Sequence, residues 1–161
     1  HIDTHQHVHY SPFIFTIIKI LSKEFKINKI RKIDEKFNVN CFFKNFKFKF
    51  HNNNYLKYLL LKIFKRKDFN KKNTSDYFFG ILNSGKIQLN ELLLYIDKIN
   101  ENKTIELCIH PSNHTNKSLD SKFSDFYENK DRQHEKKLLL SKKFINELAK
   151  RHVKILPFSA Y

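Results

Sequence analysis

Histidine or aspartate alternates with other residues along the first nine positions of the chain. The odd positions carry only histidine and aspartate: His1, Asp3, His5, His7 and His9. Successive side chains of a β-strand point to opposite faces, so this spacing predicts a strand over residues 1–9 that carries all of these polar groups on one face. Ser11 and Pro12 then predict the start of a helix, as an N-cap followed by proline in the first turn.

The remaining pattern predicts further helices and strands in alternation. Helical spacing of apolar residues covers residues 12–25, 55–64, 89–99 and 131–152. Short apolar runs predict strands at 29–33, 104–109 and 153–158. Both glycines lie in 77–85, where we expect a turn near the site, and polar loops are expected at 34–54, 65–75 and 112–129. This order indicates an α/β fold with a parallel sheet.

Composition narrows the class of protein. With 161 residues and 40% hydrophobic residues, the chain can form one domain with a core. Its net charge of +15 permits nucleic-acid binding, but the lysines are spread along the chain, which favours compositional drift over a binding patch. Cys41 and Cys108 form no CxxC pair, which suits a reducing cytoplasm. No apolar run approaches membrane-spanning length, so we expect neither a membrane nor a nucleic acid among its partners.

The histidine-rich start is the strongest chemical signal in the sequence. Imidazoles and a carboxylate on one strand face are typical of a metal site, although one metal cannot bind them all from a single strand. We expect one direct ligand, with the others supporting it or facing the substrate, and Asp3 orienting a histidine ring. A tag remnant or a solvated edge strand are the competing interpretations.

Two weaker signals follow further along the chain. In the run TIELCIHPS, Glu106, Cys108 and His110 share one strand face, and His110 stands at the strand end before a proline. His110 is therefore a candidate acid or base, against the alternative of an ordinary surface histidine. Arg132 and Glu135 have i, i+3 spacing in the last predicted helix, which allows them to pair; a solvated helix face explains the pattern equally well.

Taken together, these motifs resemble the YdjC/ChbG-like carbohydrate deacetylase family. HIDTHQHVH resembles the family motif H-x-D-S-H-x-H-x-H, with threonine at position 4 in place of the commoner serine. The runs FFGILNSGKIQLNELLLYI, TIELCIHPS, DRQHEKKLLLS and VKILPFSAY resemble later family segments in the same order. The resemblance covers the chain from end to end, and the first motif is its most specific part.

The resemblance implies a fold, a reaction and a set of residues. The expected fold is a partial, distorted TIM-like barrel, with residues 1–161 as one domain that forms the C-terminal portion of the enzyme. The implied reaction is removal of acetyl groups from N-acetylated sugars with a divalent metal, Mg²⁺ first and Zn²⁺ or Mn²⁺ as alternatives. The expected metal ligand is His5, and the expected catalytic groups are His110 and Asp3. Substrate-facing or supporting roles fall to His1, His7, His9, Glu106, Arg132 and Glu135.

Some family features are not found in this sequence. The Asp-Asp-Phe-Gly motif and the His-Leu-x-Leu type motif are absent, and we expect both in a segment upstream of His1. A catalytically inactive remnant is therefore the alternative to an enzyme, and a basic nucleic-acid-binding protein is a more distant one. The sugar, the metal and a homo-oligomeric state are left open.

Overall fold

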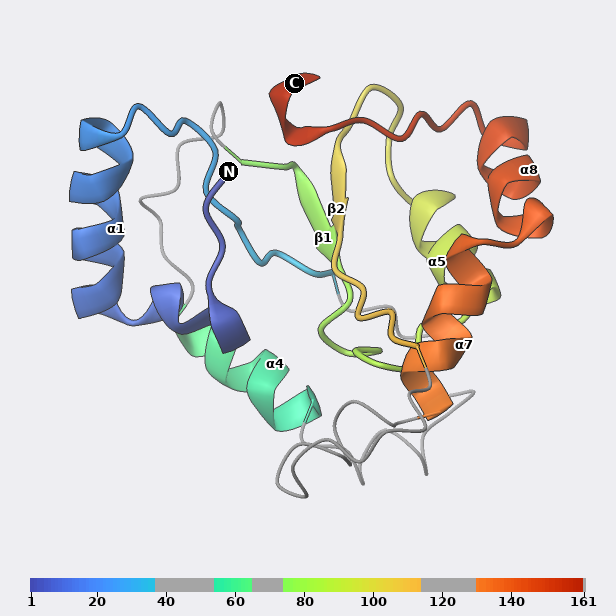
Figure 1. Cartoon of the computed structure of the whole chain (residues 1–161), viewed down its shortest axis with the longest axis horizontal. Helices are drawn as coiled ribbons and strands as arrows, with labels where there is room; N and C mark the ends of the chain where they lie inside the picture. Colours follow the sequence, from blue (N-terminus) through green and yellow to red (C-terminus); the bar gives the residue numbers. More distant parts are fainter. Residues whose placement is uncertain (37–53, 65–73, 114–129, 161) are drawn as a thin grey trace.

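The computed structural model describes residues 1–36, 54–64, 74–113 and 130–160 (Figure 1). The elements are, in chain order, η1 (His5–Tyr10), α1 (Pro12–Glu24), α4 (Asn54–Ile63), β1 (Tyr77–Phe79), α5 (Leu89–Ile96), β2 (Ile105–Leu107), α7 (Lys130–Leu139), α8 (Lys142–Lys150) and η3 (Phe158–Ala160). Strands and helices are mixed, as the alternating pattern predicts. Most of the loops expected at 34–54, 65–75 and 112–129 lie outside the described residues.

The sheet is small and parallel. Strands β1 and β2 pair in register, with Phe78 opposite Glu106, and a separate parallel bridge joins Ile2 to Ile30. The strand predicted at 29–33 is therefore reduced to one bridge, and residues 153–157 are irregular where a strand was predicted. Within the described ranges the strands do not close into a barrel, so the expected TIM-like architecture is seen only as a mixed α/β arrangement.

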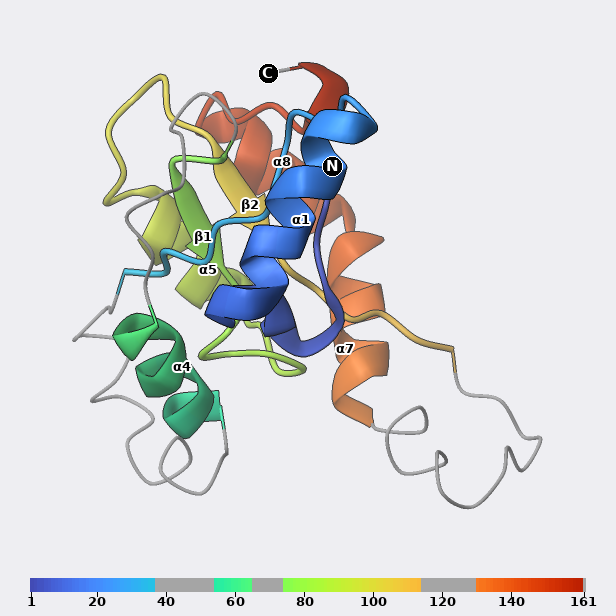
Figure 2. The same ribbon diagram turned by 90° about the vertical axis from the view of Figure 1, so that its left-hand side faces the viewer.

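Two hydrophobic clusters flank β1. Phe79 packs with residues of α5, α7 and α8, whereas its neighbour Phe78 packs on the opposite side with Tyr10, Tyr58 and Cys108. Adjacent strand residues point to opposite faces, which explains why two phenylalanines in sequence enter different clusters. Figures 1 and 2 show the same division, with α1 and α4 on one side of the strands and α5, α7 and α8 on the other.

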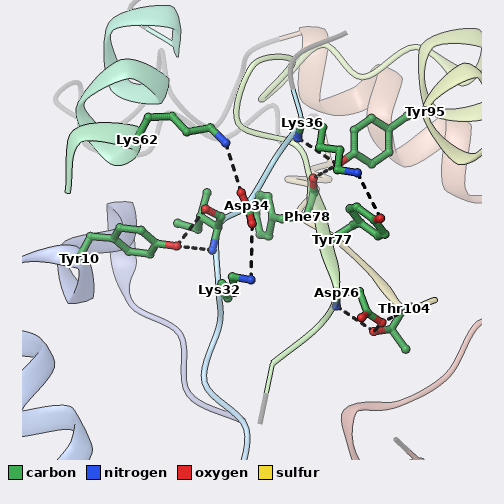
Figure 3. A network of polar contacts seen from close by, with 11 residues as sticks. Tyr10, Lys32, Asp34, Lys36, Lys62, Asp76, Tyr77, Phe78, Tyr95 and Thr104 are labelled. Carbon is green, nitrogen blue, oxygen red and sulfur yellow. Dashed lines mark hydrogen bonds and ion pairs between the residues drawn. The ribbon is translucent and has the colours of Figure 1, made fainter. Parts of the chain in front are cut away.

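Residues 30–36 run beside β1 without forming a strand, and polar contacts hold them there (Figure 3). The Tyr10 hydroxyl donates to the Ile33 carbonyl at 3.0 Å. The Lys36 amide donates to the Tyr95 hydroxyl at 3.2 Å, and that hydroxyl donates to the Phe78 carbonyl at 2.9 Å. Tyrosine hydroxyls thus replace ladder hydrogen bonds between this segment and its neighbours.

A buried carboxylate fixes the turn after β1. Glu35 is 2% exposed, and its oxygens accept hydrogen bonds from the amides of Gly80, Ile81 and Leu82 at 2.7–3.4 Å. These amides would otherwise be buried without partners, which is costly. The turn predicted for residues 77–85 is therefore present. The first three residues of that range form strand β1, which the sequence pattern did not predict.

The helices follow the apolar periodicity with one correction. The single helix predicted over 131–152 is two helices, α7 and α8, which meet at Ser141. The Ser141 side chain accepts from the Phe144 amide at 3.1 Å, as an N-cap residue does, so it starts a new helix. On α1, Phe15 and Ile18 are buried, whereas the opposite face exposes the apolar residues Phe13, Ile17, Ile20 and Leu21. None of the helices in the described part of the chain has the length and hydrophobicity of a transmembrane segment.

Candidate functional site

The histidine segment begins as extended chain and then turns. The Ile2 amide donates to the Lys29 carbonyl at 2.7 Å, and the Arg31 amide donates to the Ile2 carbonyl at 2.8 Å. From His5 the backbone turns into η1, whose 3-10 geometry is interrupted by a kink at Gln6 and His7, with left-handed φ values of 51° and 62°. The strand predicted over residues 1–9 is therefore wrong beyond its first residues, and the histidine side chains do not share one face.

His9 is fully buried, and both ring nitrogens are bonded. Its Nε2 lies 2.9 Å from the Arg31 carbonyl and its Nδ1 lies 2.6 Å from the Thr4 hydroxyl. A carbonyl only accepts, so Nε2 carries the proton and Nδ1 accepts from Thr4. Burial lowers the pKa of His9, which keeps the ring neutral. His9 therefore supports the fold of this segment through both of its ring nitrogens.

His7 is buried beside His9 but lacks comparable partners. Its ring makes edge contacts with the rings of Phe78 and His9, with centroids 6.1 and 6.3 Å apart. Its Nδ1 is buried without a hydrogen-bond partner among the described residues. Burial, with the positive charges of Lys57 and Arg31 and the neighbouring His110, lowers the pKa of His7 to about 3. The ring is therefore neutral over the physiological range.

A cluster of charges joins the histidine segment to β2. The Arg31 guanidinium lies 2.6 Å from the Asp3 carboxylate and also donates to the Glu106 carboxylate. His1 Nε2 approaches Glu106 at 3.7 Å while its ring stacks on Phe158. Burial raises the pKa of Glu106, and Arg31 opposes that shift. Asp3, His1 and Glu106 thus meet around one arginine that the sequence did not single out.

His110 follows β2 and faces the same region. Burial, with the positive charges of Arg132, Lys57 and Arg31, lowers the pKa of His110. Its Nε2 lies 3.9 Å from the Cys108 sulfur, and its Nδ1 is a buried nitrogen with no hydrogen-bond partner in the described structure. A neutral imidazole whose ring nitrogen has no partner among the residues described can accept a proton there.

Glu135 bonds to backbone amides of two other segments. The side chain is fully buried in α7, and its two oxygens accept from the amides of His110 at 2.7 Å and Ile87 at 3.3 Å. Burial raises the pKa of Glu135, and these hydrogen bonds and the charge of Arg132 oppose the shift. Glu135 therefore fixes the backbone at the end of β2, with Arg132 close enough to act on it electrostatically.

Comparison with known proteins adds a family to this geometry. A model of the family described as YdjC-like protein matches residues 1–150. The chain belongs to the YdjC-like family. Searches of curated proteins and of solved structures find no match. The resemblance to this family that the sequence motifs indicate is thereby confirmed.

Two site residues of this YdjC-like chain escaped the sequence interpretation. Arg31 lies in the predicted strand over residues 29–33, between Lys29 and Lys32, and nothing in that run distinguishes it from the other cations. Lys57 lies on α4, half-buried, and its charge acts on both His7 and His110. Burial lowers the pKa of Lys57. Neither residue belongs to a local motif, so only their placement in three dimensions reveals them.

A YdjC-like enzyme is expected to bind a divalent metal, which requires several ligand side chains close together. His5, the expected ligand, is exposed, whereas His7 and His9 are buried. Across residues 1–36, 54–64, 74–113 and 130–160, no three His, Cys, Asp or Glu side chains converge as a metal-binding group. The described residues do not fit a complete divalent-metal site by themselves.

Proposed function

We propose that this YdjC-like chain belongs to a carbohydrate deacetylase, which removes acetyl groups from N-acetylated sugars by amide hydrolysis. The family match over residues 1–150 carries the proposal. The half-buried His110, whose pKa is lowered, supports it, because amide hydrolysis needs a group that moves a proton between water and the leaving amine.

His110 is the residue we assign to that proton transfer. Its lowered pKa favours the neutral imidazole, which can accept a proton at the start of the reaction. Water gives a proton to His110 as its oxygen bonds to the acetyl carbonyl carbon. The tetrahedral intermediate then breaks its C–N bond, and His110 returns the proton to the sugar nitrogen. The products are acetate and the free amino sugar.

In this proposal Asp3 has a supporting role, and the metal is based on the family alone. The Asp3 carboxylate pairs with Arg31 at 2.6 Å, which favours a supporting role over direct proton transfer. Dependence on Mg²⁺, Zn²⁺ or Mn²⁺ is proposed from the family alone, because the described residues do not complete a metal site. No step above passes through a metal.

Acetate release from an N-acetylated chitooligosaccharide tests the proposal. We expect His110→Asn to lower kcat by about 100-fold or more, the usual worth of a general acid–base group. His134→Asn is the matched control, since His134 is an exposed histidine of α7. The assay is run with Mg²⁺, Mn²⁺ or Zn²⁺ and with a chelator. An equal effect of the two variants would contradict the role of His110.

A sugar-binding protein without catalysis is the second candidate. The observation that favours it is the lack of a three-ligand metal group among the described side chains, together with the exposure of His5. Calorimetric titration with the same oligosaccharide separates the two functions. Binding without acetate release under any of the metal conditions would support the non-catalytic function and contradict the enzyme.

A further inference from the structure

We propose that Arg31 is a positioning residue for the site: its two-sided contact with Asp3 and Glu106 holds the histidine segment against β2. This role in catalysis rests on the proposed deacetylase function. The role in positioning does not, because it concerns contacts that exist without substrate. Nothing in the family motifs quoted above points to this arginine.

The side chain of Arg31 joins two parts of the chain that are far apart in sequence. One side of the guanidinium lies 2.6 Å from the carboxylate of Asp3, in the histidine segment. The other side donates through Nε to Glu106, in the middle of β2. The guanidinium carbon also lies 5.8 Å from the ring centre of Phe78, which is fully buried in β1.

The backbone of Arg31 contacts the same segment twice. Its amide donates to the Ile2 carbonyl at 2.8 Å, before the turn. Its carbonyl accepts from His9 Nε2 at 2.9 Å, after the turn. The left-handed residues Gln6 and His7 lie between these two anchors. Arg31 therefore spans the stretch that carries His7, whose Nδ1 has no hydrogen-bond partner within the described ranges.

The geometry requires arginine rather than any cation. A guanidinium is planar and presents donors on several sides, so it can bond two carboxylates at once. A lysine ammonium keeps the charge beside the buried Glu106 but is a single point donor on a flexible stem. Arg31→Lys therefore keeps a positive charge beside the buried Glu106 but removes the bridge between the two segments.

Arg151→Lys is the matched control for this substitution. Arg151 also bridges two carboxylates, with Asp97 and Glu147 both at 2.7 Å, but it lies near the surface at the end of α8. The two variants thus make the same chemical change in the same kind of contact. Only the variant at Arg31 changes a contact to the histidine segment.

Kinetics of acetate release measure the catalytic consequence. We expect Arg31→Lys to lower kcat by about tenfold or more with KM within about twofold, because misplaced groups lose reactivity more than binding. Arg151→Lys is expected to keep both constants. A kcat for Arg31→Lys equal to that of the parent chain would overturn the proposal.

A nuclear magnetic resonance experiment tests the positioning without any activity. We expect Arg31→Lys to speed hydrogen exchange of the Ile2 amide by about tenfold and to remove the ¹⁵N signature of a His9 ring protonated at Nε2. If the parent chain releases no acetate, the proposed function fails and this measurement alone decides the role of Arg31. Unchanged exchange and an unchanged His9 signature would overturn it.

Asp3→Asn is the second variant, for the case that Arg31→Lys does not fold. The Asp3 side chain is 47% exposed, so its neutralisation leaves no new buried charge. It removes the ion pair on one side of Arg31 and keeps the Arg31–Glu106 pair. We expect faster exchange at Ile2 and a partial loss of kcat, and the absence of both would count against the bridge.

Discussion

The His7 imidazole makes folding of this chain sensitive to acid. The side chain is 93% buried, with 7% of its surface exposed, and burial above all lowers its pKa from 6.5 to about 3. The His7 ring is thus protonated near pH 6.5 in the unfolded chain, but only near pH 3 in the folded chain. The stability that this group contributes is complete above pH 6.5 and is lost as the pH falls toward 3. The loss approaches about 1.4 kcal/mol per pH unit in that window.

Urea unfolding between about pH 7.5 and pH 4.5, in buffer with a chelator, measures this dependence. We expect His7→Asn to flatten the decline in unfolding free energy, since asparagine tolerates the left-handed backbone and does not titrate there. Gln6→Asn is the control, because Gln6 occupies the same turn at φ 51° without a titrating side chain. If the unfolding free energies of both variants fall with pH as steeply as that of the parent chain, His7 is not the titrating group.

At the scale of elements, the contact between the ends of β1 and β2 depends on Gly80. Gly80 has φ 128°, and a Cβ added there would lie 2.2 Å from the Cys108 carbonyl oxygen. The backbone must move to relieve that overlap. The adjacent hydrogen bond from the Cys108 amide to the Phe79 carbonyl, at 2.9 Å, resists this movement. We expect Gly80→Ala to cost about 3 kcal/mol or more in urea unfolding.

Gly85 separates steric overlap from backbone strain. It has φ 82°, but an added Cβ there would meet no atom within 4 Å. Gly85→Ala should therefore cost only the strain of a left-handed alanine, about 1–2 kcal/mol. Equal losses for the two alanine variants would show that close packing against Cys108 does not matter.

The elements differ in how far the sequence predicts them, and the reasons are physical. Helices α1, α4 and α5 carry apolar residues at helical spacing, so their positions are predicted to within a few residues. The break at Ser141 has a capping serine, but the helical pattern continues across it and hides it. The turn at His7 has no sequence signal, because a left-handed histidine is uncommon and period-2 spacing points to a strand.

At the scale of the whole molecule, the sequence finds the site's histidines but not the residues that connect them. His7 and His110 belong to local motifs, and the fold brings them close enough for His110 to contribute to the lowered pKa of His7. Arg31 and Lys57 come from other segments, and their part in the site depends on tertiary packing. A motif of nearby residues can identify a family, whereas contacts across about 75 positions, as between Arg31 and Glu106, require coordinates.

The net charge of +15 is the remaining property of the whole molecule that points to a partner. Sequence-specific nucleic-acid contacts usually use arginine forks, yet Arg31 and Arg151 are each engaged by two carboxylates. We therefore expect only weak binding without sequence preference, which falls steeply with salt. Gel-shift titration with duplex DNA and with single-stranded RNA should give no complex at about 0.15 M salt. A complex that survives this salt and distinguishes between sequences would contradict that expectation and restore nucleic acid as a partner.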